Sequence, residues 1–331
     1  MSVNHTFDPE TDQDLSEVLN LATEKRMAIK RIKLDEKFES IDGAERVAER
    51  VRKCGTYLNF DVYEHKQTHE KLRTLKEANF CDVRKFCPFC AERYSRKTAA
   101  DFLGRVAKLD KDWREIDEFL KQPKSSLRML FLTLTVENCN LEDLKTTLQA
   151  MSRGWQRLTQ QQAWRNAVLG SLRGVEYLGD KTPPGEAHPH FHAVLLVEES
   201  YFHHGYISHA SWRSMWRKAM RLDYDPQVNV QMIKPRRKKD GTRIPAAAAA
   251  AFEVAKYAVS TASVERIDNE NFEKLYRQTK GARQFAYGGI LNKVEPVEPE
   301  EIDPAIWDYI GEEIYQWGQN EKGKYQYFKK E

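Results

Sequence analysis

Apolar runs suited to strands alternate with helical stretches between residues 128 and 260. Residues 128–136 are apolar and rich in β-branched side chains, which predicts a strand. Asn140 is a suitable N-cap for a helix, and the apolar residues after it recur at spacings of four, three, four and three. They are Leu144, Leu148, Met151, Trp155 and Leu158. The pattern therefore predicts one strand followed by a long amphipathic helix.

The same alternation continues towards the C-terminus. The predicted elements are, in order, strand 174–178, strand 193–197, helix 208–220, strand 227–233 and helix 246–260. The order β-α-β-β-α-β with a further helix predicts an α+β fold of ferredoxin-like topology, in which helices cover one face of an antiparallel sheet. In that topology the first and third strands pair at the centre and the second lies beside the third. The uncovered face is then available for a site.

Three histidines alternate at the start of the predicted strand 193–197. Because alternate residues of a strand share a face, His188, His190 and His192 are expected on one side of the sheet. Neighbouring imidazoles suit a divalent metal ion, although such rings can also serve only as hydrogen-bonding groups. Glu176 on the second strand lies near them, so Glu176 and His188 are rival candidates for the third metal ligand.

Four of the five cysteines fall within 37 positions. Cys87 and Cys90 are separated by two residues, the spacing of a zinc knuckle. The predicted ligands of a structural zinc are Cys54, Cys81, Cys87 and Cys90, with His65 or His69 as alternatives to one of the more distant cysteines. The fifth, Cys139, stands alone and is expected to be a packed thiol.

The composition indicates a water-soluble protein with a core, since 40% of the 331 residues are hydrophobic. No apolar run approaches the roughly eighteen residues that a membrane span needs. The N-terminus has no secretory signal pattern, and the cysteine pattern fits metal binding in a reducing compartment. We therefore expect a cytoplasmic location.

Positive charge is concentrated in one short run, although the net charge is only +3. Residues 234–243 carry six cations and one anion, whereas residues 295–303 are acidic. The run suits phosphate contacts with nucleic acid, and a solvated loop is the alternative interpretation. The candidate DNA-binding residues are Lys234, Arg236, Arg237, Lys238, Lys239, Arg243 and, on the next helix, Lys256.

The predicted helix 246–260 carries a carboxylate and a phenol on one face. Pro245 suits the first turn of this helix, and Glu253 and Tyr257 are four residues apart. A tyrosine beside a bound metal can act as a covalent nucleophile, because the metal polarises a phosphodiester for attack. Tyr257 and Glu253 are therefore candidate catalytic residues.

Three of these segments together resemble the motifs of rolling-circle replication initiators, members of the HUH endonuclease superfamily. They are residues 131–135 (Phe-Leu-Thr-Leu-Thr), 188–192 (His-Pro-His-Phe-His) and 253–257 (Glu-Val-Ala-Lys-Tyr). The small-plasmid initiators with a single catalytic tyrosine are the most similar group. Cys81 with residues 87–90, and residues 287–290 (Tyr-Gly-Gly-Ile), also resemble that family, so the resemblance covers about residues 50–292.

The resemblance implies a metal-dependent reaction on plasmid origin DNA. His190 and His192 would bind Mn²⁺ or Mg²⁺, with Glu176 or His188 as the third ligand. Tyr257 would cut one strand at a single-stranded or hairpin site, forming a 5′-phosphotyrosine link and a 3′-OH primer. Glu253 would help water to end the reaction. Host helicase and polymerase are further candidate partners, and a homodimer is an open alternative.

The resemblance divides the chain into four regions. They are a helical N-terminal segment (1–50), a cysteine-rich zinc-binding region with a following helix (51–125), an HUH catalytic domain (126–292) and an acidic, aromatic C-terminal tail (293–331). Competing interpretations are a conjugative relaxase or single-strand transposase, and a non-catalytic zinc-dependent DNA-binding protein. A metal hydrolase for small phosphoesters is a further one, which the basic run does not favour.

Overall fold

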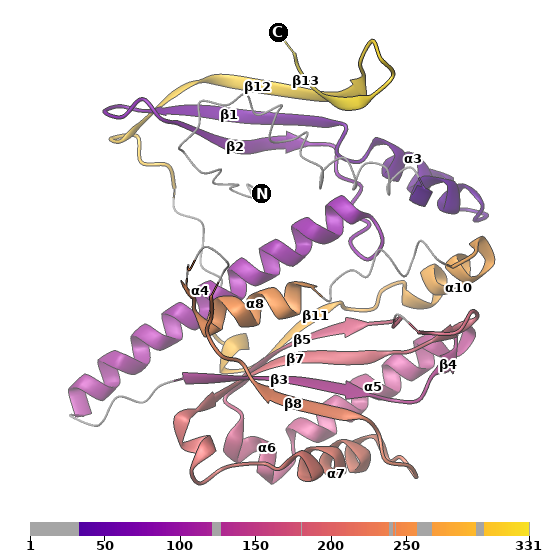
Figure 1. The fold of residues 1–331 in the computed structure, drawn as a ribbon, viewed down its shortest axis with the longest axis vertical. Helices are drawn as coiled ribbons and strands as arrows, with labels where there is room; N and C mark the ends of the chain where they lie inside the picture. Colours follow the sequence, from indigo (N-terminus) through magenta and orange to yellow (C-terminus); the bar gives the residue numbers. More distant parts are fainter. Residues whose placement is uncertain are drawn as a thin grey trace. The chain divides into compact units, whose positions relative to one another are not determined.

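A five-stranded antiparallel sheet forms the centre of the larger part of the chain (Figure 1). Its strands lie in the order β11-β5-β7-β3-β8. They are β3 (Leu127–Thr135), β5 (Gly170–Glu176), β7 (His190–Glu198), β8 (Val228–Met232) and β11 (Phe285–Gly289). The first and third predicted strands, β3 and β7, do pair antiparallel at the centre, and β5 lies beside β7.

The computed structural model describes residues 33–120, 127–179, 181–237, 241, 243–256, 267–295 and 301–330. The chain forms two compact units: unit 1 comprises Met1–Arg93 and Glu298–Glu331, and unit 2 comprises Tyr94–Val297. Helix α4 (Pro88–Leu120) begins in unit 1 and continues in unit 2. Residues 1–32 of the predicted helical N-terminal segment (1–50) lie outside the described residues, whereas α3 (Glu45–Lys53) forms at the end of that segment.

Helices α5 (Leu144–Thr159) and α7 (His209–Met220) pack on one face of the unit 2 sheet. The ring of Phe191 on β7 contacts Trp155 of α5 and Trp216 of α7. Helix α7 begins where the sequence predicts it, because the hydroxyl of Ser208 accepts a hydrogen bond from the backbone of Ser211. This face is therefore the helix-covered face expected from the sequence.

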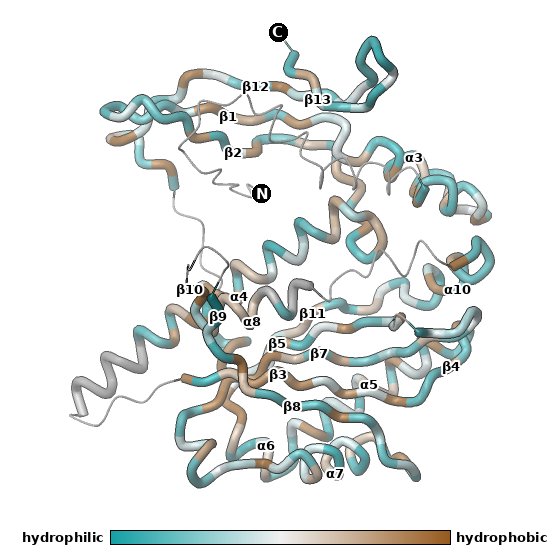
Figure 2. The backbone as a smooth tube through the Cα atoms, in the orientation of Figure 1, coloured by the Kyte–Doolittle hydropathy of each residue, from teal (hydrophilic) through white to brown (hydrophobic). Residues whose placement is uncertain are grey.

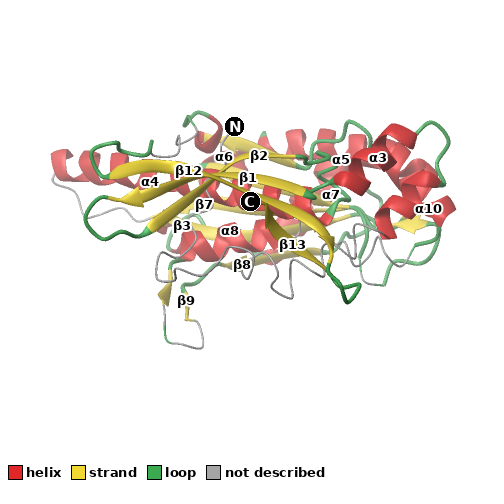
Figure 3. Cartoon of the chain, turned by 90° about the horizontal axis from the view of Figure 1, so that it is seen from above, coloured by secondary structure: helices red, strands yellow, loops and turns green. Residues whose placement is uncertain are grey.

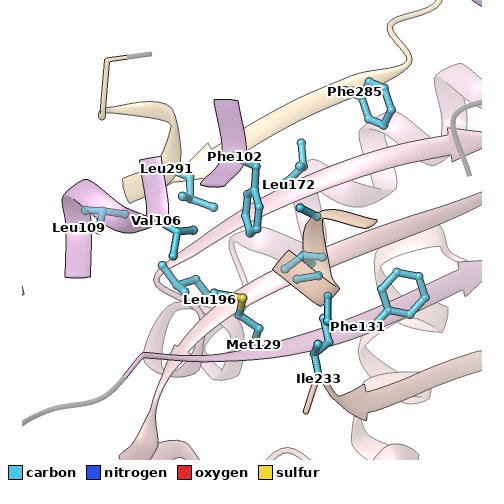
Figure 4. Packing of buried hydrophobic residues seen from close by; sticks show 14 residues of the cluster. Phe102, Val106, Leu109, Met129, Phe131, Leu172, Leu196, Ile233, Phe285 and Leu291 are labelled. Atoms are coloured by element: carbon cyan, nitrogen blue, oxygen red, sulfur yellow. The ribbon is translucent and has the colours of Figure 1, made fainter. Parts of the chain in front are cut away.

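The opposite face of this sheet is not left open, which differs from the expectation. Phe102 and Val106 of α4, and Ala249–Ala251 of α8 (Ala246–Lys256), form one buried cluster with Met129, Phe131, Leu172, Val194 and Leu196 (Figure 4). The reason lies in β7, which is apolar on both faces and needs a cover on each. The candidate site occupies the end of this face, where β7 begins.

Short elements complete unit 2. They are β4 (Cys139–Asn140), η1 (Leu141–Asp143), α6 (Gln162–Ala167), β6 (Glu186–Ala187), η2 (Glu199–Phe202), β9 (Arg236–Arg237), β10 (Arg243–Ile244), α10 (Asn269–Thr279) and η3 (Ile290–Asn292). Strand β9 is hydrophilic in Figure 2, and the ribbon that it forms with β10 projects beyond the neighbouring sheet and helices in Figure 3. The basic run of the sequence thus contributes an exposed ribbon.

A second antiparallel sheet organises unit 1, in the order β13-β12-β1-β2. Its strands are β1 (Tyr57–His65), β2 (Lys71–Ala78), β12 (Trp307–Gln319) and β13 (Tyr325–Lys330). Leu58, Phe60 and Leu75 are buried against Tyr315 and Tyr327. Residues 307–330 therefore form two strands of this sheet, rather than a separate C-terminal tail. The mixed α+β architecture predicted from the sequence is confirmed.

Candidate metal and catalytic site

Glu176, His190 and His192 converge at one end of the unit 2 sheet. Glu176 ends β5 and is paired with His190 in the β5–β7 register, so the two side chains share a face with His192. Oε2 of Glu176 lies 3.0 Å from Nε2 of His190 and 3.2 Å from Nε2 of His192. All three side chains are at least 85% covered. The cluster is a candidate metal site.

The ring orientations follow from the contacts of the Nδ1 atoms. Nδ1 of His190 lies 2.7 Å from the backbone oxygen of His188, and Nδ1 of His192 lies 3.2 Å from Oγ1 of Thr133. A carbonyl oxygen only accepts hydrogen bonds, so Nδ1 of His190 carries a proton and Nε2 of the neutral ring carries a lone pair. If His192 has the same tautomer, the lone pairs of its Nε2, of Nε2 of His190 and of Oε2 of Glu176 point towards one another. A proton or a metal cation among them is then needed for stability.

The spacing and the protonation of these groups fit a six-coordinate divalent metal ion. Adjacent ligands at about 2.1 Å from an octahedral ion lie about 3 Å apart, close to the two Nε2–Oε2 distances. Burial alone would raise the pKa of Glu176, but when Nε2 of His190 and His192 carry protons, their hydrogen bonds to Oε2 outweigh burial and lower this pKa to about 2. Burial lowers the pKa of His192. Both shifts favour the carboxylate and neutral imidazole that a metal binds.

His188 lies outside the converging set. Its Nδ1 is 2.7 Å from Oδ1 of Asn138, whose side-chain nitrogen donates to Glu186. Burial also lowers the pKa of His188. Of the two candidates for a third ligand, the structure brings Glu176 to the histidine pair, and His188 contributes its backbone oxygen to His190 instead.

Helix α8 carries Glu253 to the neighbourhood of this cluster. The helix packs on β3, β5 and β7. The negative charges of Glu176 and Glu253 raise the pKa of His192 and so partly offset the lowering caused by burial. Oε1 of Glu253 accepts a hydrogen bond of 2.6 Å from a guanidinium nitrogen of Arg236. Tyr257, the predicted nucleophile, lies outside the described residues, one residue beyond the end of α8.

The predicted DNA-binding residues are only partly described. Lys234, Arg236, Arg237 and Arg243 are exposed on or next to the β9–β10 ribbon. Lys238, Lys239 and the side chain of Lys256 lie outside what is described. Arg237 pairs with Arg243 in the register of the ribbon, so two cationic residues occupy neighbouring positions. An anionic partner would relieve their repulsion.

The four cysteines predicted to bind zinc do come together in unit 1. The sulfur of Cys54 lies 3.6 Å from that of Cys90 and 3.5 Å from that of Cys87, and the sulfurs of Cys81 and Cys90 are 3.5 Å apart. All four are buried. A tetrahedral zinc at about 2.3 Å from each sulfur requires sulfurs about 3.8 Å apart, so the cluster fits this ion.

The histidine alternatives to this cluster are used elsewhere. Nδ1 of His65 accepts hydrogen bonds from the backbone nitrogens of Gln67 and Thr68. His69 contacts Glu64. The backbone nitrogen of Cys81 instead donates to the sulfur of Cys54. The set brought together is therefore the four-cysteine one.

The side-chain contacts of Asn138 and Arg236 near the candidate site were not predictable from the sequence. The side chain of Asn138 fixes His188, and the pairing of Arg236 with Glu253 links the basic ribbon to α8. Both contacts join residues far apart in the chain, and a short motif carries no signal for them. Thr133 belongs to a motif segment, but its contact with His192 depends on the register between β3 and β7.

Comparisons with known proteins show the family to which the chain belongs. The family described as Replication protein matches residues 72–330. A "Protein rep" of Lactiplantibacillus plantarum is 32% identical over 273 residues, which cover 80% of this chain and 79% of the relative. A "Protein rep" of Lentilactobacillus hilgardii is 32% identical over 286 residues, which cover 82% of this chain and 84% of the relative.

A third relative is a "Protein rep" of Bacillus amyloliquefaciens, 33% identical over 261 residues, with 75% of this chain and 71% of the relative covered. No solved structure matches this chain significantly. Among the described helices, none combines the length and apolar character needed to cross a membrane. The chain therefore belongs to the replication protein (Rep) family of plasmid replication initiators.

Proposed function

We propose that this protein starts rolling-circle replication by cutting one strand of a plasmid origin, as a metal-dependent tyrosine endonuclease of the HUH superfamily. The observation that carries this proposal is the convergence of Glu176, His190 and His192 at the end of the central strands. Helix α8, which leads into Tyr257, packs on the same sheet. Membership of the Rep family supplies the substrate class, plasmid origin DNA. The strand order of unit 2 is consistent with the ferredoxin-like topology of that superfamily.

Cleavage would be a direct exchange at phosphorus. Mn²⁺ or Mg²⁺ held by the three side chains would polarise the scissile phosphate and stabilise its developing charge. The phenol oxygen of Tyr257 forms a bond to phosphorus, and the bond from phosphorus to the 3′ oxygen breaks. The phenolic proton is transferred to the leaving oxygen. The products are a 5′-phosphotyrosine and a 3′-OH that primes synthesis.

Termination would use Glu253. A carboxylate four residues before Tyr257 cannot form a second phosphotyrosine, but it can accept a proton from water. The water oxygen bonds to phosphorus, the bond to the Tyr257 oxygen breaks, and the proton passes through Glu253 to the released phenolate. This step would end the reaction instead of starting another round.

The remaining predicted residues would serve DNA binding and folding. Zn²⁺ on Cys54, Cys81, Cys87 and Cys90 would stabilise unit 1. The β9–β10 ribbon with Lys234, and Lys256 on α8, would contact phosphates. Because the relatives found are replication proteins, an initiator is favoured over a relaxase or a transposase.

Strand cleavage tests this function. Single-stranded oligonucleotides that tile the replicon are incubated with the protein in Mn²⁺ or in EDTA, and products are separated on a denaturing gel. We expect one cut strand in Mn²⁺ and none in EDTA, and His190→Ala should lower the rate at least about 100-fold. Full cleavage in EDTA would contradict metal dependence. No cleavage on any oligonucleotide, with DNA binding that depends on the cysteine cluster, would favour a non-catalytic zinc-dependent binding protein.

A further inference from the structure

The ion pair between Arg236 and Glu253 connects the basic ribbon to the helix of the candidate site. Arg236 lies on β9, Glu253 lies on α8, and the nitrogen–oxygen distance is 2.6 Å. The two ends differ in exposure: the Arg236 side chain is 58% exposed and the Glu253 side chain 17%. The guanidinium is therefore accessible from solvent, while the carboxylate it holds faces the protein.

The neighbouring cation of the ribbon has a different partner. Arg237 donates to the backbone oxygen of Gly241 and stands opposite Arg243. Arg236 stands opposite Ile244, and its guanidinium turns to α8 instead. Of the two arginines of β9, Arg236 is paired with α8 and Arg237 is not, so the two residues provide a matched comparison.

A guanidinium binds carboxylate and phosphate with the same pair of parallel N–H groups. A DNA phosphate that reaches the exposed face of Arg236 therefore competes directly with Glu253. The Arg236 end of the pair is exposed to water, so replacing one anion by another on its guanidinium changes the free energy little. While Arg236 holds Oε1 of Glu253, that contact orients the carboxylate towards the ribbon and restricts its rotation towards a water molecule at the tyrosine link.

We propose that Arg236 is a positioning residue that changes partners: it holds Glu253 in the DNA-free protein and releases it when a DNA phosphate takes the guanidinium. This inference rests on the proposed role of Glu253 in activating water. Its consequence is that hydrolysis of the tyrosine–DNA link requires a DNA strand bound to the β9–β10 ribbon. An unloaded ribbon keeps Glu253 occupied and protects the covalent link while synthesis proceeds.

A binding experiment tests the exchange without relying on catalysis. In a Tyr257→Phe background, which removes the nucleophile, the affinity for a labelled single-stranded origin oligonucleotide is measured in Mn²⁺ by fluorescence anisotropy. Glu253→Gln removes the competing carboxylate charge, so it should tighten binding about threefold to tenfold. In an Arg236→Ala background the same substitution should change affinity less than about twofold.

Arg237→Ala is the matched control. In that background, Glu253→Gln should still tighten DNA binding as it does in the parent, because Arg237 is not paired with Glu253. An equal gain in all three backgrounds would mean that Glu253 repels DNA through space, and would overturn the exchange. Absence of any gain in the parent would overturn it as well. Circular dichroism melting of each variant excludes loss of folding as the cause.

A second readout uses the covalent link in proteins that keep Tyr257. Arg236→Ala should shorten the lifetime of the tyrosine–DNA link at least about threefold in the absence of added strand, and Arg236→Lys should restore part of it. An unchanged lifetime would overturn the exchange. If the unsubstituted protein forms no link at all, the proposed nicking function fails, whereas the binding experiment still decides the fate of the Arg236–Glu253 exchange.

Discussion

Nδ1 of His190 lies 2.7 Å from the backbone oxygen of His188. This contact turns Nε2 of His190 towards Glu176, so the first histidine of the motif orients the second through its main chain. Replacing the His188 side chain leaves that oxygen in place. We therefore predict that His188→Ala keeps Mn²⁺ binding within about threefold, whereas His190→Ala and Glu176→Ala each weaken it at least about tenfold.

Isothermal titration of Mn²⁺ into the zinc-loaded protein measures these affinities. Asn138→Ala serves as a second control, because it removes the partner of the His188 side chain and leaves the three candidate ligands unchanged. If His188→Ala lost Mn²⁺ as completely as His190→Ala does, the imidazole of His188 would be a ligand and the assignment of Glu176 would be wrong.

The four-cysteine cluster predicts one tightly bound zinc per chain. Cys87→Ala should abolish it and destabilise unit 1, because the binding free energy of a structural zinc is part of the folding free energy. Cys139→Ala is the matched control, since Cys139 lies outside the cluster. Native mass spectrometry gives the stoichiometry. Retention of one zinc in Cys87→Ala would show that the cluster is not the metal site.

A charge network in unit 1 predicts an acid-dependent loss of stability. The Glu313 carboxylate accepts hydrogen bonds from Arg73 and Lys329, and its side chain is 11% exposed. Burial raises the pKa of Glu313, but these hydrogen bonds outweigh it and lower the pKa to about 2. The ionised form is therefore favoured in the folded state, and Glu313→Gln should cost about 2 kcal/mol of unfolding free energy at neutral pH.

The sign of the pH dependence follows from the lowered pKa. The contribution of Glu313 is complete above its ordinary pKa of 4.5 and is lost as the pH falls towards about 2. The difference in unfolding free energy between the parent and Glu313→Gln, measured in urea, should shrink across that interval. Glu321→Gln, an exposed counterpart, should show no such difference. A difference that stays constant from neutral pH to pH 2 would contradict the assignment.

Glu253 predicts a separation of the two chemical steps. In Glu253→Gln the initial cleavage should proceed within about threefold of the parent rate, because Tyr257 makes that attack. Release of the DNA by water should slow about 100-fold. Quench-flow and gel analysis of the covalent species give both rates. Equal slowing of both steps would assign Glu253 to the first attack or to metal binding.

Local patterns were sufficient for most of unit 2. Period-two and helical patterns gave β3, β7, α5 and α7 to within a few residues, because each carries a strong apolar face. The histidines and cysteines that converge in the structure were among the candidate ligands predicted from their spacing, since metal sites impose residue types and short separations. The predicted strand order placed Glu176 near the histidines, and the observed pairing of β5 with β7 agrees with that order.

Features that depend on distant pairing were not predictable in the same way. The sheet of unit 1 joins β1 to β12 across more than half of the chain, and its polar, aromatic strands lack a clean alternation. The cover that α4 and α8 place over the second face of the unit 2 sheet follows from packing, not from a motif. The contact of Arg236 with Glu253 has the same origin.

The most direct measurement is peptide mass spectrometry of the protein after incubation with single-stranded origin DNA and Mn²⁺. The account predicts a nucleotide adduct on the peptide that contains Tyr257, absent in Tyr257→Phe and in EDTA. Strand cleavage without an adduct, or an adduct on another residue, would contradict the tyrosine mechanism.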